Sequence, residues 1–592
     1  MTTETSLTGA EEVKWDLTDL YSDHESLERE IAEVDSEANE FARIYRGKVD
    51  SLNAEELADS LSLFEKLQDR MGRAFTYVFL NWCTNTDDSE RGALMQKIRE
   101  QGTLIGQKVL FYEIELIQLE DNKAAKLLSS RELDSFRHFL EILRLRKKHI
   151  LSEPEEKILA EKSVTGPEAW NRFFDETLGR ARFSFRGKEL TEQEILAKLY
   201  DAERNVRKDA ADSFTEGLRK QIKSLTFVFN TILAEKASDD RLRSYDHWLA
   251  SRNLSNEISD EAVDALISSV TDRYDLVARF YRLKKRILGL DELHDFDRYA
   301  PVGEADNQFK WEDAKRLVLE AYTAFHPQMG TIANDFFERR WIDAALAPGK
   351  RGGAFSHRAV PQVHPYIMMN FTGNVRDVQT LAHELGHGVH QYLSREQGSL
   401  QGSTPLTTSE MASVFGEMLV FEKLLQTETC SSRKLALLVS KIDDTMATVF
   451  RQVAMNRFED QIHNIRRSEG ELSVERFSES WIKSQEEMFQ GSVLLGEHYR
   501  IWWSYIPHFV HTPGYVYAYA FGELLVLALY GIYQQDRGEF PAVYLQLLSA
   551  GGSDWPHLLL EKVGVDLRDP SFWEEGLQAI ENLIIQAEEL AG

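Results

Sequence analysis

The chain has 592 residues, of which 43% are hydrophobic and 11% aromatic, so it can bury a large core and is not a disordered protein. With only 34 glycines and 13 prolines it contains few helix-breaking residues, which favours long helices over many short strands. Its formal net charge of −28 repels phosphate backbones and anionic lipid headgroups, so neither nucleic acid nor a membrane is an expected partner.

The first residues of the chain and its cysteines predict a cytoplasmic protein. The opening sequence MTTETSLTGAEEVKWDL has neither the basic start nor the apolar stretch of a secretory signal peptide. The most apolar stretch, LLVLALYGIY at 524–533, is too short to span a bilayer. Cys83 and Cys430 are the two cysteines, too few for a disulfide framework and typical of a reducing compartment.

Amphipathic helices are predicted for most of the N-terminal third. In residues 57–80 and 131–151, leucine and phenylalanine recur at three- and four-residue steps, which places them on one helix face. Residues 183–191, FSFRGKELT, predict a short hairpin that turns at the Arg-Gly pair. Taking this hairpin as a boundary, we expect an N-terminal helical domain over 1–195 and a catalytic domain over 196–592.

The composition changes at residues 348–374, which contain three prolines and four glycines. Glycine allows a backbone to bend closely around a ligand. Within this stretch, HPYIMMNF at 364–371 is a short apolar run that predicts a strand. Two helices are expected to follow, at about 375–394 and about 408–426, with Asn374 as the N-cap of the first.

The sharpest chemical signal is HELGH at 383–387, inside the first of these helices. Residues four apart share one helix face, so His383 and His387 present two imidazoles to one point, as zinc ligation requires. Glu384 can then reach a water at the metal and act as general base. The same pattern also occurs by chance on solvated helices.

A catalytic zinc ion needs a third protein ligand, and two glutamates are candidates. Glu410 opens the second helix, 23 residues after His387, and Glu417 lies seven residues further on the same face. One of them can ligate the metal while the other orients an imidazole. Glu410 also has a purely structural interpretation, because Thr407 and Glu410 fit a helix capping box.

A second group of candidates lies in IPHFVHTPGYVYAYAFG at 506–522. Hydrolysis of a peptide builds negative charge on the carbonyl oxygen, to which tyrosine hydroxyls or a histidine N–H can donate. If the segment is extended, alternating tyrosines point to opposite sides. A structural aromatic patch beside a turn would look the same. The candidate residues are His508, His511, Tyr515, Tyr517 and Tyr519.

Together these motifs resemble the oligoendopeptidase F family, relatives of thimet oligopeptidase among the zinc metallopeptidases. The resemblance is carried by GKRGGAFS, HPYIMMNFTGNVRDVQTLAHELGHGVHQYLS, TSEMASVFGEM and PHFVHTPGYVYAYAFGELL, and WDLTDLYSD at 15–23 extends it to nearly the whole chain. It implies a mainly α fold, a helical ellipsoid with a deep central channel and a small β-sheet next to the HExxH helix.

The resemblance also implies the roles of the metal-site residues. One Zn²⁺ ion would be held by His383, His387 and Glu410 on the channel floor. Glu384 would be the general base. Glu417 would stand behind the ligands as an acidic residue of the second shell.

Substrate and transition-state residues follow from the same resemblance. The PHF context favours His508 as the transition-state histidine, with Tyr515 and Tyr519 as hydroxyl donors, while His511 and Tyr517 stay open. The edge of the strand at 364–371 would pair with the substrate backbone, and the GGAFS loop would lie beside it. This gives four candidate substrate-binding residues: Gly353, Ala354, His364 and Tyr366.

The expected activity is hydrolysis of internal bonds in short, unstructured peptides, the partners that the resemblance implies. Two alternatives are open. The same zinc site can serve a carboxypeptidase or an aminopeptidase, or the chain can be a non-catalytic, peptide-binding helical scaffold. The oligomeric state has no signal in the sequence.

Overall fold

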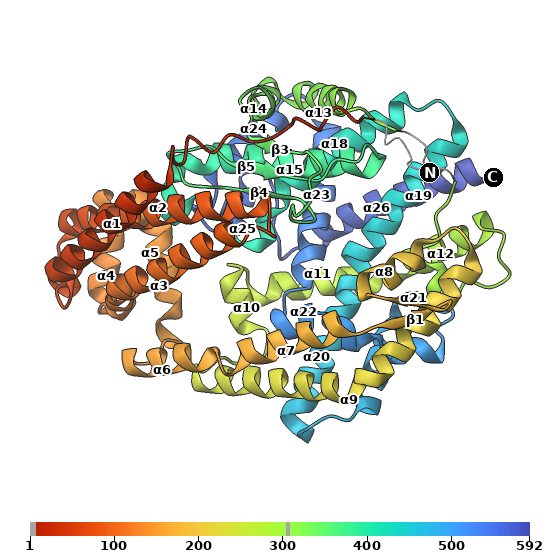
Figure 1. Cartoon of the computed structure of the whole chain (residues 1–592), viewed down its shortest axis with the longest axis horizontal. Helices are drawn as coiled ribbons and strands as arrows, with labels where there is room; N and C mark the ends of the chain where they lie inside the picture. Colours follow the sequence, from red (N-terminus) through yellow and green to blue (C-terminus); the bar gives the residue numbers. More distant parts are fainter. Residues whose placement is uncertain (1–6, 304–307) are drawn as a thin grey trace. The chain divides into compact units, whose positions relative to one another are not determined.

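Long helices dominate the structure, as the low content of glycine and proline predicts, and the longest, α9, covers Arg204–Leu242 (Figure 1). The structure is a computed structural model that describes residues 7–303 and 308–592. Over these residues, no helix is at once long and apolar enough to cross a membrane. The fold is mainly α with two small sheets, which confirms the predicted fold class.

The chain divides into two units, each made of three stretches of sequence. The first unit comprises Met1–Lys147, Asp306–Thr427 and Ile532–Val565. The second comprises Lys148–Ala305, Glu428–Gly531 and Asp566–Gly592. The expected boundary at residue 195 concerns domains that are continuous in sequence, and it stays a prediction.

The N-terminal part of the first unit is a bundle of three long helices that pack against one another (Figure 1). Aromatic rings join them: Tyr112 lies with its ring centroid 5.0 Å from that of Phe41 and 5.2 Å from that of Phe64. The helices are α1 (His24–Tyr45), α2 (Ala54–Cys83) and α3 (Ser89–Gln118), followed by α4 (Asp121–Leu128).

The amphipathic pattern at 131–151 does not form one helix. Phe136 does not have an α-helical backbone conformation, since its φ is −125° and its ψ is 2°. The α-helix α5 therefore begins only at Arg137 and covers Arg137–Leu145. Short 3-10 turns flank it at Arg131–Phe136 and Arg146–Lys148. The periodic face is kept, since Leu133, Phe136, Leu140 and Leu143 are all buried.

A three-stranded sheet and the HExxH helix form the rest of the first unit. Strand β5 (Tyr366–Met368) lies between β3 (Ile342–Asp343), which is parallel to it, and β4 (Phe355–His357), which is antiparallel. The sheet packs against α15 (Val375–Ser394), whose capping box at Asn374 and Asp377 sets the predicted start. The other helices are α13 (Trp311–Phe325), α14 (Pro327–Glu338), α16 (Gly398–Gln401), α17 (Leu406–Ser409), α18 (Met411–Thr427), α24 (Phe540–Ala550) and α25 (Pro556–Glu561).

Helices α15 and α18 lie unusually close together, and glycine allows it (Figure 1). A Cβ at Gly386, inside HELGH, would stand 2.3 Å from the carbonyl oxygen of Ala412 in α18. Two buried tyrosines tie the same helices to their neighbours: Tyr322 donates to Ala382 O at 2.5 Å, and Tyr544 donates to Met411 O at 2.7 Å.

The second unit begins with α6 (Glu153–Ser163) and α7 (Pro167–Arg180), after which the predicted hairpin is confirmed. Strands β1 (Phe183–Phe185) and β2 (Lys188–Leu190) pair antiparallel, and Arg186 and Gly187 turn with positive φ of 49° and 81°. The remaining helices are α8 (Glu192–Ala197), α9, α10 (Ala250–Ser255), α11 (Asp260–Asp272), α12 (Tyr274–Ile287), α19 (Ser431–Thr445), α20 (Arg451–Glu469), α21 (Val474–Phe489), α22 (His508–His511), α23 (Tyr517–Gln535, which runs on past the unit boundary) and α26 (Pro570–Ala591).

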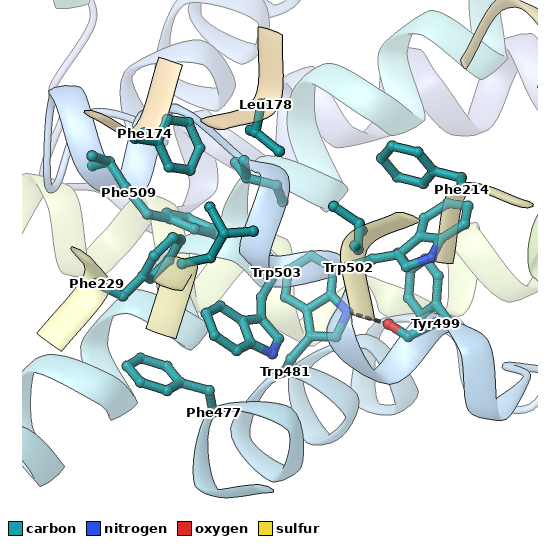
Figure 2. Packing of buried hydrophobic residues seen from close by; sticks show 14 of the residues in the cluster. Phe174, Leu178, Phe214, Phe229, Phe477, Trp481, Tyr499, Trp502, Trp503 and Phe509 are labelled. Atoms are coloured by element: carbon teal, nitrogen blue, oxygen red, sulfur yellow. Dashed lines mark hydrogen bonds between the residues drawn. The ribbon is translucent and has the colours of Figure 1, made fainter. Parts of the chain in front are cut away.

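An aromatic core holds the second unit together and fixes α22 (Figure 2). Trp481, Trp502 and Trp503 are buried at its centre, and the indole N–H of Trp481 donates to the carbonyl of Tyr499 at 3.1 Å. Phe509 packs into this core beside Phe458, with a centroid distance of 5.2 Å. Burial of Phe509 therefore sets the position of its neighbour His508.

Candidate metal centre and active-site residues

The two histidines of HELGH converge with Glu410, as the spacing predicts. The imidazole centroids of His383 and His387 lie 4.8 Å apart on successive turns of α15. Glu410 Oε2 lies 3.5 Å from Nε2 of His383 and 3.4 Å from Nε2 of His387. Ligand atoms of all three residues fall within 4.8 Å of one another. Two imidazole nitrogens and one carboxylate oxygen are a donor set that fits a catalytic zinc ion.

Glu410 stands at a break between two helices. The region 408–426 was expected as one helix, but α17 ends at Ser409 and α18 begins at Met411. The interruption lets Glu410 point toward α15, and Ser413 Oγ donates to its Oε2 at 2.8 Å. The carboxylate therefore faces the histidines.

Glu417 lies on the other side of His383. The Nδ1 of His383 donates to Glu417 Oε1 at 2.5 Å, so its Nε2 is the nitrogen that faces Glu410. A carboxylate behind a histidine ligand fixes the tautomer and the ring orientation of that histidine. Of the two candidate glutamates, the geometry thus brings Glu410 to the centre and leaves Glu417 behind it.

Charges at this centre are strongly coupled. Burial disfavours the imidazolium of His383, but the hydrogen bond and the charge of Glu417 outweigh burial and raise its pKa to about 9. Burial likewise works against ionisation of Glu410, yet the hydrogen bond and charge of His387 lower its pKa to about 2. Burial raises the pKa of Glu384, against the opposing charges of His383 and His387. A raised pKa suits a carboxylate that must accept and return a proton.

The strand expected to bind substrate proves to be the central strand. Because β3 pairs with one side of β5 and β4 with the other, the prediction that the 364–371 strand offers its edge to a peptide is wrong. Within the described sheet, β3 and β4 are the two edge strands. Gly353, with a φ of +81°, and Ala354 lead directly into β4, and Asn370 Nδ2 donates to Gly353 O at 3.0 Å.

The side chains of His364 and Tyr366 face the core rather than a substrate. The His364 ring stacks on Trp341 at a centroid distance of 4.0 Å, and its Nε2 lies 3.1 Å from Asp19 Oδ2. Tyr366 is 0% exposed and packs edge-on against Trp15. Since both edges of their strand are paired and both side chains pack in the core, the structure does not support the predicted substrate binding by His364 and Tyr366.

In the second unit, His508, Tyr515 and Tyr519 form one cluster. His508 Nε2 lies 3.2 Å from the Tyr519 hydroxyl, its ring is parallel to that of Tyr515 at 6.0 Å, and the two tyrosine rings are 5.0 Å apart. Helix α23 begins at Tyr517, so the tyrosines follow a helical rather than an extended spacing. Tyr515 lies two residues before the helix, and the chain turns there so that its ring meets that of Tyr519.

His511 and Tyr517, the two open candidates, point elsewhere. His511 Nε2 lies 2.8 Å from Asp175 Oδ1. The hydroxyl of buried Tyr517 donates to Asn253 Oδ1 and accepts from Asn256 Nδ2, each at 2.8 Å. Both residues anchor the segment that carries His508 and Tyr519.

Several supporting residues could not be found from the sequence. Glu459 accepts from the Gly514 N–H at 2.9 Å and thereby holds the turn between α22 and α23. Tyr322 and Asn370, described above, hold α15 and the loop before β4. Their segments look like ordinary amphipathic helix or strand, and only the tertiary contacts reveal their part in the site.

Comparison with known proteins finds relatives over nearly the whole chain. The family model described as peptidase family M3 matches residues 197–579, and the model described as oligopeptidase F matches residues 115–183. Among curated proteins, oligopeptidase PepF of Bacillus subtilis is 29% identical over 97% of this chain and 87% of its own. Group B oligopeptidase PepB of Streptococcus agalactiae is 27% identical over 98% of this chain and 97% of its own.

Solved structures share the fold. A crystal structure from Chlamydophila abortus matches with a TM-score of 0.87 and 23% identity over 98% of both chains. Oligoendopeptidase-F from Enterococcus faecium matches with a TM-score of 0.72 and 22% identity, over 96% of this chain and 99% of its own. Because the M3 model covers well over half of the sequence, the chain belongs to peptidase family M3.

Proposed function

We propose that this peptidase is a zinc-dependent oligoendopeptidase that hydrolyses internal bonds of short, unstructured peptides. The observation that carries the proposal is the convergence of His383, His387 and Glu410, whose ligand atoms lie within 4.8 Å of one another. Relatives named oligopeptidase and oligoendopeptidase over nearly the whole chain support the substrate class.

Nε2 of His383, Nε2 of His387 and a carboxylate oxygen of Glu410 would hold the ion. When bound at such a site, zinc polarises a carbonyl and lowers the pKa of water to about 7. Glu417 keeps the Nε2 lone pair of His383 turned toward the centre through its hydrogen bond to Nδ1.

The remaining steps belong to side chains of this protein. Glu384, 6% exposed, accepts the proton of the attacking water and returns it to the leaving amine. His508 and Tyr519, with Tyr515 beside them, donate to the negative charge that develops on the carbonyl oxygen. The open edge of β4, with Gly353 and Ala354, pairs with the peptide backbone.

The location and partners follow from the chemistry of the chain. Both cysteines are free thiols, which fits a reducing cytoplasm. The net charge of −28 fits peptides rather than nucleic acid or an anionic membrane as the binding partner.

The decisive experiment is mass spectrometry of a defined mixture of short peptides after incubation with zinc-loaded wild type and Glu384→Gln. Internal cuts by wild type alone support the proposal. Stepwise loss of terminal residues would assign the same site to an exopeptidase. Equal cleavage by Glu384→Gln would refute Glu384 as general base, and no cleavage by either protein would refute the peptidase site.

A further inference from the structure

An arginine close to His508 lacks an acidic partner. Arg451 is the first residue of α20 and follows a π-helical turn at Met446–Phe450. Its Nη1 donates to the Tyr299 hydroxyl at 3.0 Å, and its Nε is buried with no partner. Among the described residues, no carboxylate oxygen lies within 4.0 Å of this guanidinium group. A π-helical turn such as the one before Arg451 often accompanies a functional site.

A second buried arginine reinforces the positive charge. Arg298 is 3% exposed, its Nε donates to the Asp295 carbonyl at 3.0 Å, and its guanidinium lies 5.0 Å from the centroid of the Tyr299 ring. Burial alone would raise the pKa of Tyr299, but the charges of Arg298 and Arg451 outweigh it and lower that pKa. Tyr299 therefore stands between two guanidinium groups.

Arg207, a buried arginine elsewhere in this unit, is neutralised by an acid. Arg207, only 2% exposed, donates through Nη2 to Asp297 Oδ1 at 2.9 Å. A guanidinium that is half removed from water without such a partner carries a desolvation cost, which an anion from outside the chain can offset. The planar fork of arginine matches a carboxylate better than any other protein cation does.

Arg451, the arginine without an acidic partner, lies near His508, one of the proposed transition-state residues. Tyr299, Arg451, Tyr505 and His508 are all half-buried rather than enclosed, so each retains access to solvent. Tyr505, three residues before His508, interacts with the Arg451 guanidinium. After burial, the charge of Arg451 is the main factor that lowers the pKa of His508.

We propose that Arg451, together with the Tyr299 hydroxyl, binds a carboxylate of the peptide substrate close to the bond that is cleaved. The assignment rests on the proposed peptidase function, because it takes His508 to act at the scissile carbonyl. The carboxylate is either the C-terminus of the peptide or an acidic side chain. The preferred substrates are thus peptides with a negative charge near the cleaved bond, despite the acidic character of the chain as a whole.

The test uses one peptide sequence in four versions. Two versions differ only in a free or amidated C-terminus, and two differ only in Glu or Gln beside the cleaved bond. The kcat/KM ratio of acid to neutral version is measured for zinc-loaded wild type, Arg451→Met and Arg451→Lys. Arg457→Met is the matched control, since Arg457 lies on the same helix and pairs with Asp460 at 3.7 Å.

We expect wild type and the control to favour one acidic version about 10- to 100-fold, mainly through KM. Arg451→Met should bring that ratio to about 1, and Arg451→Lys, which keeps the charge but loses the fork, should retain part of it. The pair of peptides whose ratio collapses identifies the carboxylate as C-terminus or side chain. No preference in wild type, or an unchanged ratio in Arg451→Met, would overturn the proposal.

Two further measurements keep this result separate from its premises. Thermal unfolding of each variant shows whether it folds; if Arg451→Met does not, an unchanged ratio in folded Arg451→Lys overturns the proposal by itself. If wild type cleaves none of the peptides, the peptidase function fails. Calorimetric binding of the same four peptides to wild type and to the Arg451 variants then tests the carboxylate subsite. Weaker binding of an acidic version alone to the Arg451 variants would support the subsite, and equal binding would overturn it.

Discussion

Glu417 in α18 accepts a hydrogen bond from Nδ1 of His383 in α15 at 2.5 Å, and the opposite nitrogen of the same ring faces Glu410. Glu417 thus orients the His383 ring, while Glu410, just before α18, faces the opposite nitrogen of that ring. The two ligand-bearing segments cannot shift independently without breaking this contact.

Loss of the Glu417 carboxylate should therefore weaken the metal site without removing a ligand. We expect Glu417→Ala to lower zinc affinity about 10- to 100-fold, measured by competition with a chromophoric chelator. Glu422→Ala is the control, because Glu422 lies on the same helix but binds Arg537 and Gln534. Equal affinities of the two variants would show that the hydrogen bond to His383 does not orient it.

The close approach of α15 and α18 makes Gly386 a sensitive position. In Gly386→Ala the new methyl group would lie 2.3 Å from Ala412 O, so the helices must separate. Overpacking of this kind costs about 1–3 kcal/mol, and separation would also carry Glu410 away from the histidines. We expect a lower thermal midpoint and weaker zinc binding. Gly531→Ala in α23, where a Cβ meets nothing within 4 Å, should be neutral or slightly stabilising.

Tyr519 and Tyr517 should behave in opposite ways although they are two residues apart. Tyr519→Phe removes a hydroxyl that lies 3.2 Å from His508, and we expect kcat to fall about 10²- to 10³-fold with little change in thermal midpoint. Tyr517→Phe leaves Asn253 and Asn256 without their buried partner and should lower stability by about 1–3 kcal/mol. A larger kcat loss in Tyr517→Phe would reverse our assignment of the pair.

Glu459 should make the stability of the protein depend on pH. Burial raises its pKa from an ordinary value near 4.5 to about 8, because the hydrogen bond from Gly514 and the charge of Arg252 only partly compensate. The folded state then binds a proton that the unfolded chain releases, so this contribution is present below about pH 4.5 and is lost as pH rises through about 8. We expect Glu459→Gln to raise the thermal midpoint above pH 8 and to have little effect below pH 5. Equal midpoints at high pH would show that the carboxyl group stays ionised at no cost.

Local rules of sequence carry a large part of the site. The start of α15 follows from the Asn374 capping box, and the spacing of His383 and His387 places both rings on one face. These features depend on residues within a few positions of one another. Their prediction needs no knowledge of the rest of the chain.

Features that depend on distant segments could not be predicted. The central place of β5 comes from β3, two residues long and without a visible strand pattern of its own. The helix break at Glu410 serves contacts with α15 that no local preference encodes. The tyrosine partners of Arg451, in place of an acidic one, likewise reflect which side chains the fold brings near it, and an arginine in a helix gives no hint of that.

The interleaving of the two units has a consequence for biosynthesis. The chain passes from one unit to the other after residues 147, 305, 427, 531 and 565. In the first unit, Tyr544 of α24 donates a hydrogen bond to the Met411 carbonyl. In the second unit, α26 packs on α19, and its Glu588 accepts a hydrogen bond from Arg279 of α12. A ribosome makes these two helices after every other large piece of their units. Neither unit can complete its core before its own last long helix, α24 or α26, has left the ribosome, so the apolar surfaces of α15 and α19 that these helices cover stay exposed until then.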